Sequence, residues 1–259
     1  MYMQTKKIIN HITSWLEDYN KSSETQGFVI GVSGGIDSAV TSTLAAITKL
    51  PVLCIEMPIL QNHEQVNRGE KHINWLKKKY NNVKSIECDL TNIFENFKKS
   101  FPVKEKNNEL ALTNTRSRLR MTTLYYYAQN YNYLVVGTGN KVEDFGIGFF
   151  TKYGDGGVDI SPIADLMKSE VYKIAKELNI IKPILDAAPT DGLWENDKTD
   201  EDQIGASYDE LEWAMKFKGD TKHLNIREKQ VLGIYNKFNL TNKHKMLPIP
   251  VCDIPKSLK

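Results

Sequence analysis

The chain has 259 residues, with 34 lysines and arginines against 32 aspartates and glutamates, which leaves a formal charge of +2. This length is enough to bury the core of one large α/β domain. Hydrophobic residues make up 41% and charged residues 25% of the chain, the composition of a folded globular protein rather than a disordered one. A charge this near zero argues against a surface built mainly for nucleic acid or for an anionic membrane.

The cysteines and the apolar segments bear on where the protein works. Cys54, Cys88 and Cys252 lie far apart, and none belongs to a C-x-x-C pair, so neither a zinc site nor a disulfide framework is expected. Cys54 and Cys88 fall in strand-like segments and are expected to be small buried hydrophobic residues. No stretch is long and apolar enough to span a membrane, and the segment after Lys6 and Lys7 is too polar for a secretory signal. We therefore expect a protein of the reducing cytoplasm.

Hydrophobic periodicity predicts strands that alternate with helices through the first half of the chain. The expected helices cover residues 8–19, 39–45, 66–80, 91–99 and 112–131, and the expected strands cover 27–32, 52–57, 83–88 and 133–136. This alternation implies parallel strands joined by right-handed crossovers, hence a doubly wound open sheet flanked by helices. Ligands bind such sheets beyond the carboxyl ends of the strands, which directs attention to residues 33–38 and to the segments after Met57 and Gly137.

The second half of the chain begins with a change in composition. Glycines, aromatic residues and acids are interleaved from residue 139 to 161, and a long glycine-rich stretch inside a compact domain is typical of a functional loop. Residues 187–202 are also poor in apolar periodicity. Helical periodicity returns around 208–217 and 226–238. We find no internal repeat or interdomain linker, so residues 1–259 are expected to form a single domain.

The segment Gly31-Val-Ser-Gly-Gly-Ile-Asp-Ser38 leaves a buried strand and enters a helix. Its two glycines let the backbone approach a ligand closely, and the N–H groups of the turn and of the helix N-terminus form an anion site. Asp37 would repel a bare phosphate, and a Mg²⁺ ion between carboxylate and phosphate resolves that conflict. The alternative is a Gly-Gly turn in which Asp37 caps the helix. That alternative requires neither both serines nor both glycines.

A second polar cluster follows the fourth expected strand, at the same edge of the sheet. Thr138 offers a hydroxyl group, and Glu143 and Asp144 offer carboxylates. Residues 148–168 add lysines, further acids and a glycine hinge, so this segment can bind an anionic ligand with its lysines and a metal or an amine with its acids. The alternative is a solvated glycine-rich hairpin whose phenylalanines anchor it to the core.

Ser33-Gly-Gly-Ile-Asp-Ser38 resembles the pyrophosphate loop of the ATP-pyrophosphatase superfamily, whose members cleave ATP to AMP and pyrophosphate while they adenylate a substrate. Gly148–Gly157 and Pro189–Trp194, with Asn114–Met121 and the pair His244-Lys245, resemble the signature segments of the ammonia-dependent NAD synthetases. The resemblance covers nearly the whole chain. It implies a Rossmann-like fold of the adenine nucleotide α-hydrolase type, a homodimer, and no glutaminase domain.

The resemblance also implies which residues bind each substrate. ATP would be held by Gly31, Val32, Ser33, Gly34, Gly35, Ile36, Asp37 and Ser38, together with Thr138, Lys168 and Thr190. Deamido-NAD would contact Tyr19, Arg118, Lys152, Asp159, His244 and Lys245. Asp37 and Glu143 would bind Mg²⁺, and the catalytic residues would be Asp37, Lys168 and Asp155, the last of which would orient or deprotonate ammonia. Residues 143–148 are one residue longer than the spacing in some family members, which leaves Asp144 as an alternative to Glu143 at the metal.

Two groups of residues have structural alternatives. Arg116, Arg118 and Arg120 could form a solvated helix face, and residues two apart point to different faces, so at most some of them share one ligand. The run of tyrosines at 125–127 fits a core or a subunit interface better than a cofactor site.

The implied reaction is the amidation of deamido-NAD to NAD, the final step of NAD biosynthesis. The nicotinate carboxylate attacks the α-phosphorus of ATP, pyrophosphate leaves, and ammonia then displaces AMP from the acyl-adenylate. Two other functions stay open: an adenylating enzyme that modifies tRNA, and a module that binds ATP without releasing pyrophosphate. The first usually brings an RNA-binding domain or redox cysteines, and the second does not need loops rich in lysine and acid. Because the phosphate loop begins at residue 31, no glutaminase domain fits before it, which favours free ammonia as the donor.

Overall fold

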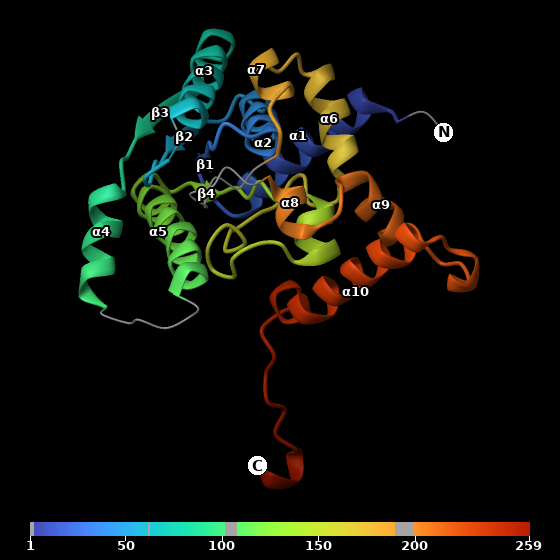
Figure 1. Ribbon diagram of the computed structural model, residues 1–259. Helices are drawn as coiled ribbons and strands as arrows, with labels where there is room; N and C mark the ends of the chain where they lie inside the picture. Colours follow the sequence, from blue (N-terminus) through green and yellow to red (C-terminus); the bar gives the residue numbers. More distant parts are fainter. Residues whose placement is uncertain (1–2, 62, 102–107, 190–198) are drawn as a thin grey trace.

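A computed structural model describes residues 3–61, 63–101, 108–189 and 199–259. Its centre is a parallel sheet in the order β3–β2–β1–β4 (Figure 1). The strands are β1 (Phe28–Gly31), β2 (Val52–Glu56), β3 (Val83–Glu87) and β4 (Leu134–Val135). Phe28 of β1 is in register with Val52 on one side and Leu134 on the other. Since β1 has a neighbour on each side and helices on both faces, its residues form a continuous apolar run.

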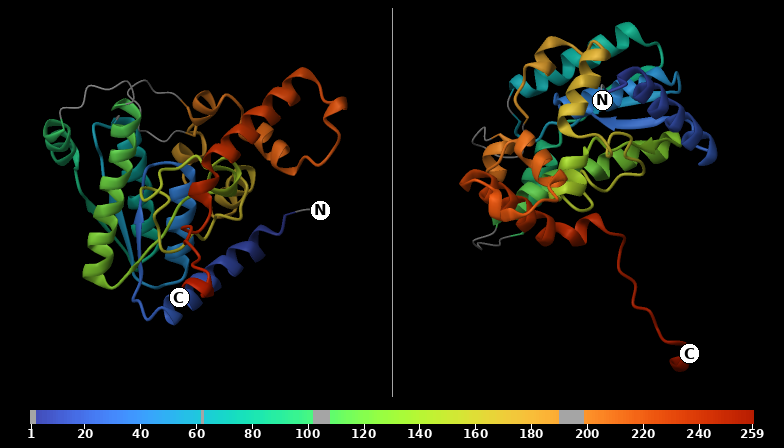
Figure 2. Two further views of the ribbon diagram at one scale, coloured as in Figure 1. Left: turned by 90° about the horizontal axis from the view of Figure 1, so that it is seen from below. Right: turned by 90° about the vertical axis from the view of Figure 1, so that its right-hand side faces the viewer.

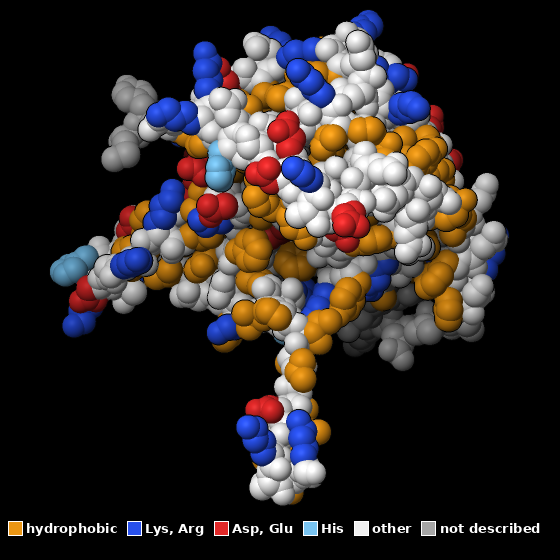
Figure 3. Space-filling model, turned by 180° about the vertical axis from the view of Figure 1, so that it is seen from behind, with side chains coloured by type: hydrophobic (Ala, Val, Ile, Leu, Met, Phe, Trp, Pro, Cys, Tyr) orange, Lys and Arg blue, Asp and Glu red, His pale blue; other side chains and the backbone are white. Residues whose placement is uncertain are grey.

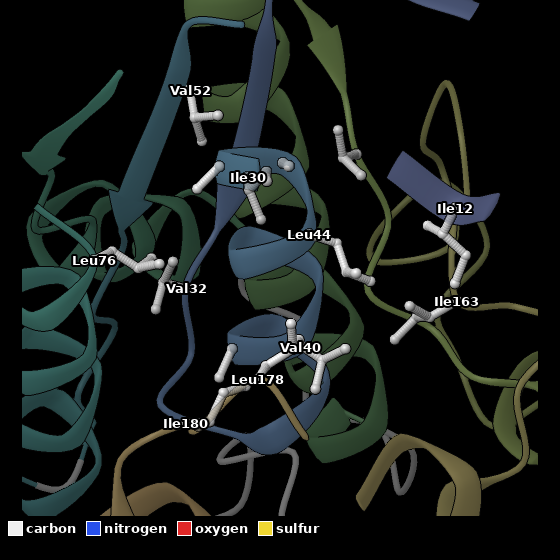
Figure 4. Packing of buried hydrophobic residues seen from close by; sticks show 14 of the residues in the cluster. Ile12, Ile30, Val32, Val40, Leu44, Val52, Leu76, Ile163, Leu178 and Ile180 are labelled. Carbon is white, nitrogen blue, oxygen red and sulfur yellow. The ribbon is translucent and has the colours of Figure 1, made fainter. Parts of the chain in front are cut away.

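Helices cover both faces of the sheet (Figures 1 and 2). One face carries α1 (Thr5–Ser22), α2 (Ile36–Ile47), α3 (His63–Lys79), α6 (Lys168–Glu177) and α7 (Lys182–Leu185), and the other carries α4 (Thr91–Ser100) and α5 (Asn108–Tyr131). Because side chains alternate along a strand, Ile30 joins the first hydrophobic core and Val29 the second. Figure 4 shows Ile30 near Leu44 of α2 in the first core, with Val40 further along α2 beside Leu178. The predicted doubly wound parallel sheet is confirmed.

A third hydrophobic cluster holds the second half of the chain beside the sheet. It is built from the π-helix η1 (Val142–Ile147) and from α8 (Asp200–Ile204), α9 (Tyr208–Lys216) and α10 (Ile226–Met246). Two short 3₁₀ turns, η2 (Thr221–His223) and η3 (Lys256–Leu258), complete the elements. After Met246 the chain runs away from the body of the molecule, as both figures show.

The helices and strands expected in the first half of the chain are all present, with ends that differ by a few residues. The main difference lies in the segment 139–161, expected as a loop, because it contains η1. A π-helix closes its hydrogen bonds over one more residue than an α-helix, and π-turns of this kind accommodate a single extra residue at functional sites. The additional residue that the sequence shows at 143–148 therefore has a structural explanation.

The burial of Cys54 agrees with the sequence-based expectation, whereas that of Cys88 agrees only in part. All three cysteines are free; Cys54 is buried, whereas Cys88 at the end of β3 is only half-buried. Among the helices that the structure describes, none combines the length and apolarity needed to cross a membrane. Of the segment 187–202, only the two ends belong to the described residues.

Candidate active site

A cavity of about 810 Å³ opens at the carboxyl ends of the strands. Its wall combines the turn after β1, the residues after β2 and β4, the middle of α5, the glycine-rich segment and the end of α10. This is where a doubly wound sheet binds ligands. The predicted ATP residues Gly31–Ser33, Gly35–Ser38, Thr138 and Lys168 all line the cavity, and so do Arg118, Lys152, His244 and Lys245.

Hydrogen bonds of its own serines fix the conformation of the phosphate loop. The Oγ of Ser38 accepts a hydrogen bond from the N–H of Ser33 at 3.2 Å and donates to the carbonyl oxygen of Gly35 at 3.0 Å. Gly34 takes a φ of +80°, which favours glycine, and a Cβ there would lie 2.6 Å from the backbone oxygen of Gln65 on α3. Gly34 thus packs behind the loop and is absent from the cavity wall, and its role is to seat the loop against α3.

Two carboxylates and one lysine meet at the start of α2. The Nζ of Lys168 lies 2.6 Å from Oδ2 of Asp37 and 2.9 Å from Oε1 of Glu143, and only 4% of the lysine side chain is exposed. Burial opposes a charge on Lys168, but the two carboxylates outweigh it and raise its pKa. Burial would also raise the pKa of Glu143, but the Lys168 ammonium and the hydroxyl of Tyr208 lower it. One positively charged and two negatively charged side chains therefore lie close together beside the phosphate loop.

Residues outside the sequence motifs position this cluster. The hydroxyl of Tyr208 donates to Glu143 at 2.5 Å, and its ring lies 4.6 Å from Nζ of Lys168. The carboxylate of the buried Glu212 accepts hydrogen bonds from the backbone N–H and the hydroxyl of Ser169, both at 2.8 Å, and so fixes the first turn of α6. Sequence reasoning missed both Tyr208 and Glu212. The α9 pattern marks only an amphipathic helix, and nothing in it shows which polar residue turns inward.

Asn140 is a third residue that the sequence analysis overlooked. Its side-chain oxygen accepts from the backbone N–H groups of Val142 and Glu143 at the start of η1, at 3.1 and 3.2 Å. Its amide nitrogen donates to Oδ1 of Asp37 at 3.3 Å. Asn140 therefore links the π-helix to the phosphate loop. An asparagine just before a helical turn is a recognisable cap signal, which could have drawn attention to it.

Asp155 also lines the cavity, and hydrogen bonds fix its carboxylate. Its Oδ1 accepts from the hydroxyl of Ser117 at 2.6 Å and from the N–H of Thr151 at 3.0 Å. Burial raises the pKa of Asp155 although these hydrogen bonds oppose the change. Asp144 also lines the cavity, and burial together with the charges of Glu143, Asp155 and Asp37 raises the pKa of its carboxyl well above the ordinary value.

The basic residues predicted to bind the dinucleotide lie close together on the cavity wall. Nε of Arg118 donates to the carbonyl oxygen of Lys152 at 3.3 Å, and Nζ of Lys152 donates to that of His244 at 3.0 Å. Nζ of Lys245 donates to the carbonyl oxygen of Phe150 at 2.7 Å. These bonds bring α5, the glycine-rich segment and the end of α10 together.

The arginines of α5 separate as their spacing predicts. Arg116 is buried over the ring of Phe94 at 4.8 Å, whereas Arg118 and Arg120 line the cavity. Nε of Arg120 donates to the carbonyl oxygen of Met57 at 3.0 Å. Arg120 thus holds the segment after β2, a role that the sequence did not reveal.

Besides Gly34, two of the predicted site residues that the structure describes, Tyr19 and Asp159, do not line the cavity. Tyr19 lies on α1 against Trp15, with ring centroids 5.6 Å apart. Asp159 accepts from the hydroxyl of Tyr125 and the N–H of Val135, both at 2.8 Å, so its carboxylate ties β4 to α5. Thr190 lies outside the described residues.

The donor set suits a magnesium ion that is shared with a phosphate. The carboxylates of Asp37 and Glu143 both reach the nitrogen of Lys168, so they lie close enough together for their other oxygens to share one cation. Hard carboxylate oxygens are the ligands that Mg²⁺ takes, usually with substrate phosphates and water in the remaining positions. Within the described ranges, no three acidic, histidine or cysteine side chains converge on a common metal position. A Mg²⁺ ion bound here would take two ligands from these carboxylates, and its other ligands would come from ATP and water.

The known proteins that resemble the chain decide its family. Residues 8–248 match the sequence model of the NAD synthase family. The chain belongs to the NAD synthase family. Among its NAD synthase relatives, the NH(3)-dependent NAD(+) synthetase of Carboxydothermus hydrogenoformans is 41% identical over 212 residues, which cover 81% of this chain and 83% of the relative. The NH(3)-dependent NAD(+) synthetase of Syntrophomonas wolfei is 35% identical over 264 residues, 99% of this chain and 100% of the relative.

A solved structure agrees with the NAD synthase assignment. The NMN synthetase from Francisella tularensis matches with a TM-score of 0.84 and 33% sequence identity, over 98% of this chain and 100% of that chain. The family inferred from the phosphate loop and the glycine-rich segment is thus confirmed, and the whole fold is shared.

Proposed function

We propose that this chain is a ligase that amidates deamido-NAD to NAD with ATP and ammonia, the final step of NAD biosynthesis. One observation supports the proposal: the same cavity is lined by the phosphate loop and Lys168, its proposed ATP end, and by Arg118, Lys152 and Lys245, its proposed dinucleotide end. A cavity with two groups of anion-binding residues suits a reaction between two phosphorylated substrates. The names of the relatives from Carboxydothermus and Syntrophomonas point to the same reaction.

The ATP end of the cavity provides the charge stabilisation that adenylation requires. The backbone N–H groups at 33–38 and the N-terminus of α2 would hold the phosphates, and the Lys168 ammonium would balance the charge that develops as pyrophosphate leaves. Asp37 and Glu143 would hold Mg²⁺. When bound, Mg²⁺ supplies Lewis-acid stabilisation of the phosphate oxygens.

The dinucleotide end would orient the nicotinate carboxylate toward ATP. Arg118, Lys152, His244 and Lys245 would bind the phosphates of deamido-NAD, since they are the cationic and polar groups on that part of the wall. One carboxylate oxygen then bonds to the α-phosphorus of ATP, and the bond between that phosphorus and the departing pyrophosphate breaks. The product is an acyl-adenylate with AMP as the leaving group.

Asp155 would serve the second half of the reaction. Ammonium must lose a proton before it is nucleophilic, and a buried carboxyl whose pKa is raised is suited to accept that proton. The nitrogen then attacks the carbonyl carbon and AMP departs with the carboxylate oxygen that had joined the phosphorus. Lys168, Asp37 and Asp155 are accordingly the catalytic residues of the proposal.

A product assay tests the proposed reaction. Purified protein with ATP, Mg²⁺, deamido-NAD and ammonium is expected to form NAD, AMP and pyrophosphate in equal amounts. Formation of ADP and phosphate would contradict the proposal. Glutamine in place of ammonium is expected to support no more than background turnover, because residues 8–248 are proposed to act as one synthetase domain without a glutaminase.

The Francisella structure favours a second candidate substrate. That protein is named NMN synthetase, so the mononucleotide acid is a reasonable alternative to deamido-NAD for this chain as well. The chemistry at the carboxylate is the same for both acids. A comparison of kcat/KM for deamido-NAD and for nicotinate mononucleotide decides between the candidates, and the larger value identifies the substrate.

We also propose a homodimer in the cytoplasm. The segment 247–259 extends from the body and carries exposed apolar side chains at Leu247, Ile249, Val251, Ile254 and Leu258 (Figure 3). Such a run is stabilised when a second copy covers it. The free cysteines suit a reducing compartment.

A further inference from the structure

One face of α3 packs against the phosphate loop. A Cβ on Gly34 would lie 2.6 Å from the backbone oxygen of Gln65, and a Cβ on Gly69 would lie 3.5 Å from the backbone nitrogen of Gly34. Positions 65, 69 and 72 are separated by four and three residues, which places them on one side of a helix. His72 therefore continues, one turn further along α3, the face that packs against the loop.

His72 is a fully buried polar residue on this face. Its ring stacks on that of Trp75 with centroids 5.6 Å apart, and its Nε2 lies 2.9 Å from Oγ of Ser42 on α2. The hydroxyl of Ser42 in turn donates to the carbonyl oxygen of Ser38 at 2.7 Å. Neither His72 nor Ser42 belongs to the wall of the cavity, so neither is placed to touch a substrate there. The two side chains instead connect α3 to the last residue of the phosphate loop.

The partners of Ser42 fix the direction of these hydrogen bonds. Both backbone atoms that its hydroxyl reaches are carbonyl oxygens, those of Ser38 and Ala39 at 2.7 and 3.2 Å, and a carbonyl oxygen can only accept. Because this uses the single proton of the hydroxyl, Nε2 of His72 must donate to Oγ. The other ring nitrogen, Nδ1, is then an acceptor without a partner among the described residues. The reverse tautomer would bury an unpaired N–H group, which proteins tolerate less well than an unpaired acceptor.

Ser38 also bonds to the rest of the phosphate loop. Its Oγ accepts from the N–H of Ser33 and donates to the carbonyl oxygen of Gly35, while its own carbonyl group is the one that Ser42 binds. A shift of Ser38 therefore changes the loop. We propose that His72, acting through Ser42, is a positioning residue that keeps the phosphate loop in the conformation that binds the phosphates of ATP. This inference rests on the proposed use of the loop for ATP.

The pair of variants His72→Phe and His72→Gln tests the positioning role. Phenylalanine keeps the ring against Trp75 but cannot donate, whereas the amide of glutamine can donate to Oγ of Ser42. Exchange of labelled pyrophosphate into ATP that depends on the nicotinate substrate reports adenylation. In this assay His72→Phe is expected to raise KM for ATP about fivefold, the effect of one neutral hydrogen bond. KM for the nicotinate substrate in His72→Phe, and KM for ATP in His72→Gln, should stay within about twofold of wild type.

Ile73→Val is the matched control. It removes one buried carbon atom from the next position of α3, which takes no part in the hydrogen bonds of Ser42. It is expected to lower the free energy of unfolding but to leave KM for ATP unchanged. An unchanged KM for ATP in His72→Phe would overturn the positioning role. A similar rise in Ile73→Val, or an equal rise in both KM values in His72→Phe, would reveal a loss of stability alone and would also overturn it.

Ser42→Ala tests the link between His72 and the loop, and it replaces His72→Phe if that variant does not fold. It removes only one hydroxyl group and is expected to raise KM for ATP by a similar factor. The double variant should be no worse than either single variant, because both substitutions break the same chain of hydrogen bonds. Two effects that multiply in the double variant would contradict a link through Ser42.

Two measurements do not depend on catalysis. Nitrogen-15 NMR of the wild type is expected to show His72 protonated at Nε2, and protonation at Nδ1 would overturn the direction of the chain. Amide hydrogen exchange of residues 33–38 should be at least about fivefold faster in His72→Phe but not in Ile73→Val, and equal exchange in wild type and His72→Phe would overturn the proposal. Absence of nicotinate-dependent pyrophosphate exchange in the wild type would refute the proposed amidation, while these two measurements would still decide the role of His72.

Discussion

Lys168 and Asp37 illustrate what can be predicted at the scale of single residues. Lys168 was assigned to ATP from the family resemblance, and Asp37 was assigned to ATP and Mg²⁺ from the phosphate loop. They are 131 residues apart in sequence, so their direct contact at 2.6 Å could not be read from either motif. Tyr208 and Glu212, which position the same cluster, escaped prediction because helix periodicity does not reveal which polar side chain packs inward.

Lys168→Met should abolish adenylation and destabilise the protein. Without the ammonium group, Asp37 and Glu143 become two buried carboxylates that repel each other. Breaking such a buried cluster costs about 3–5 kcal/mol of unfolding free energy. Chemical denaturation and pyrophosphate release measure the two effects. Lys176→Met, on an exposed position of α6, is the control and should change neither. Full adenylation by Lys168→Met would remove the lysine from the catalytic residues.

The free energy of unfolding should fall in acid because His72 binds a proton more readily in the unfolded chain than in the folded protein. This side chain is fully buried, its Nε2 lies 2.9 Å from the hydroxyl of Ser42, and its Nδ1 has no partner. Burial lowers the pKa of His72 from 6.5 to about 4. The unfolded chain therefore binds a proton that the folded protein excludes, and stability is lost as the pH falls from 6.5 toward 4. The expected loss from this one group is about 3 kcal/mol.

Denaturation at pH 7 and pH 4 for wild type and His72→Phe measures that contribution. Between pH 7 and pH 4, the free energy of unfolding of the wild type should fall by about 3 kcal/mol more than that of His72→Phe. An equal pH dependence in both would show that His72 does not exclude a proton.

At the scale of elements, periodicity predicted the sheet and its covering helices because both depend on long, regular apolar patterns. The π-helix η1 could not be predicted in this way, since its single turn is too short for a pattern and is fixed by tertiary bonds from Asn140. The sequence did show one extra residue there, but the physical meaning of that residue became clear only with the hydrogen bonds around it.

Gly34→Ala should disrupt the phosphate loop. The residue has a positive φ, and its Cβ would meet backbone atoms of α3, which cannot move aside as a side chain can. We expect the free energy of unfolding to fall by about 1–3 kcal/mol and KM for ATP to rise at least tenfold.

Gly233→Ala is the matched control for that substitution. Gly233 lies within α10, and a Cβ added there would meet no atom within 4 Å, so alanine should leave activity unchanged and stabilise the helix by about 0.5–1 kcal/mol. Similar behaviour of the two alanine variants, measured by thermal unfolding and ATP kinetics, would contradict the role of Gly34.

At the scale of the whole molecule, composition and length predicted one α/β unit of the right class. Periodicity predicted α9 and α10 as helices but could not predict that they pack beside the sheet (Figure 2). It also could not predict that the last residues run away from the body, because a periodic pattern does not show where an element lies. Val251, 87% exposed, belongs to a run of exposed apolar side chains in that last segment, and such a run is typical of a surface that a partner covers.

Ile249→Asp combined with Val251→Asp should convert the proposed dimer to a monomer. In the isolated chain both side chains face solvent, so the free energy of unfolding of the monomer should stay within about 0.5 kcal/mol of the wild-type value. Between two copies the same aspartates would be buried without partners. Light scattering after gel filtration gives the mass, and Ser257→Asp controls for added charge on the segment. A dimer that survives both substitutions would exclude this segment as the contact.

An isotope experiment shows whether adenylation activates the nicotinate carboxylate. Deamido-NAD labelled with ¹⁸O in the nicotinate carboxylate is incubated with ATP, Mg²⁺ and ammonium, and the products are analysed by mass spectrometry. If the carboxylate is adenylated, AMP will carry one labelled oxygen and pyrophosphate will carry none. Label in inorganic phosphate, or unlabelled AMP formed together with NAD, would contradict it.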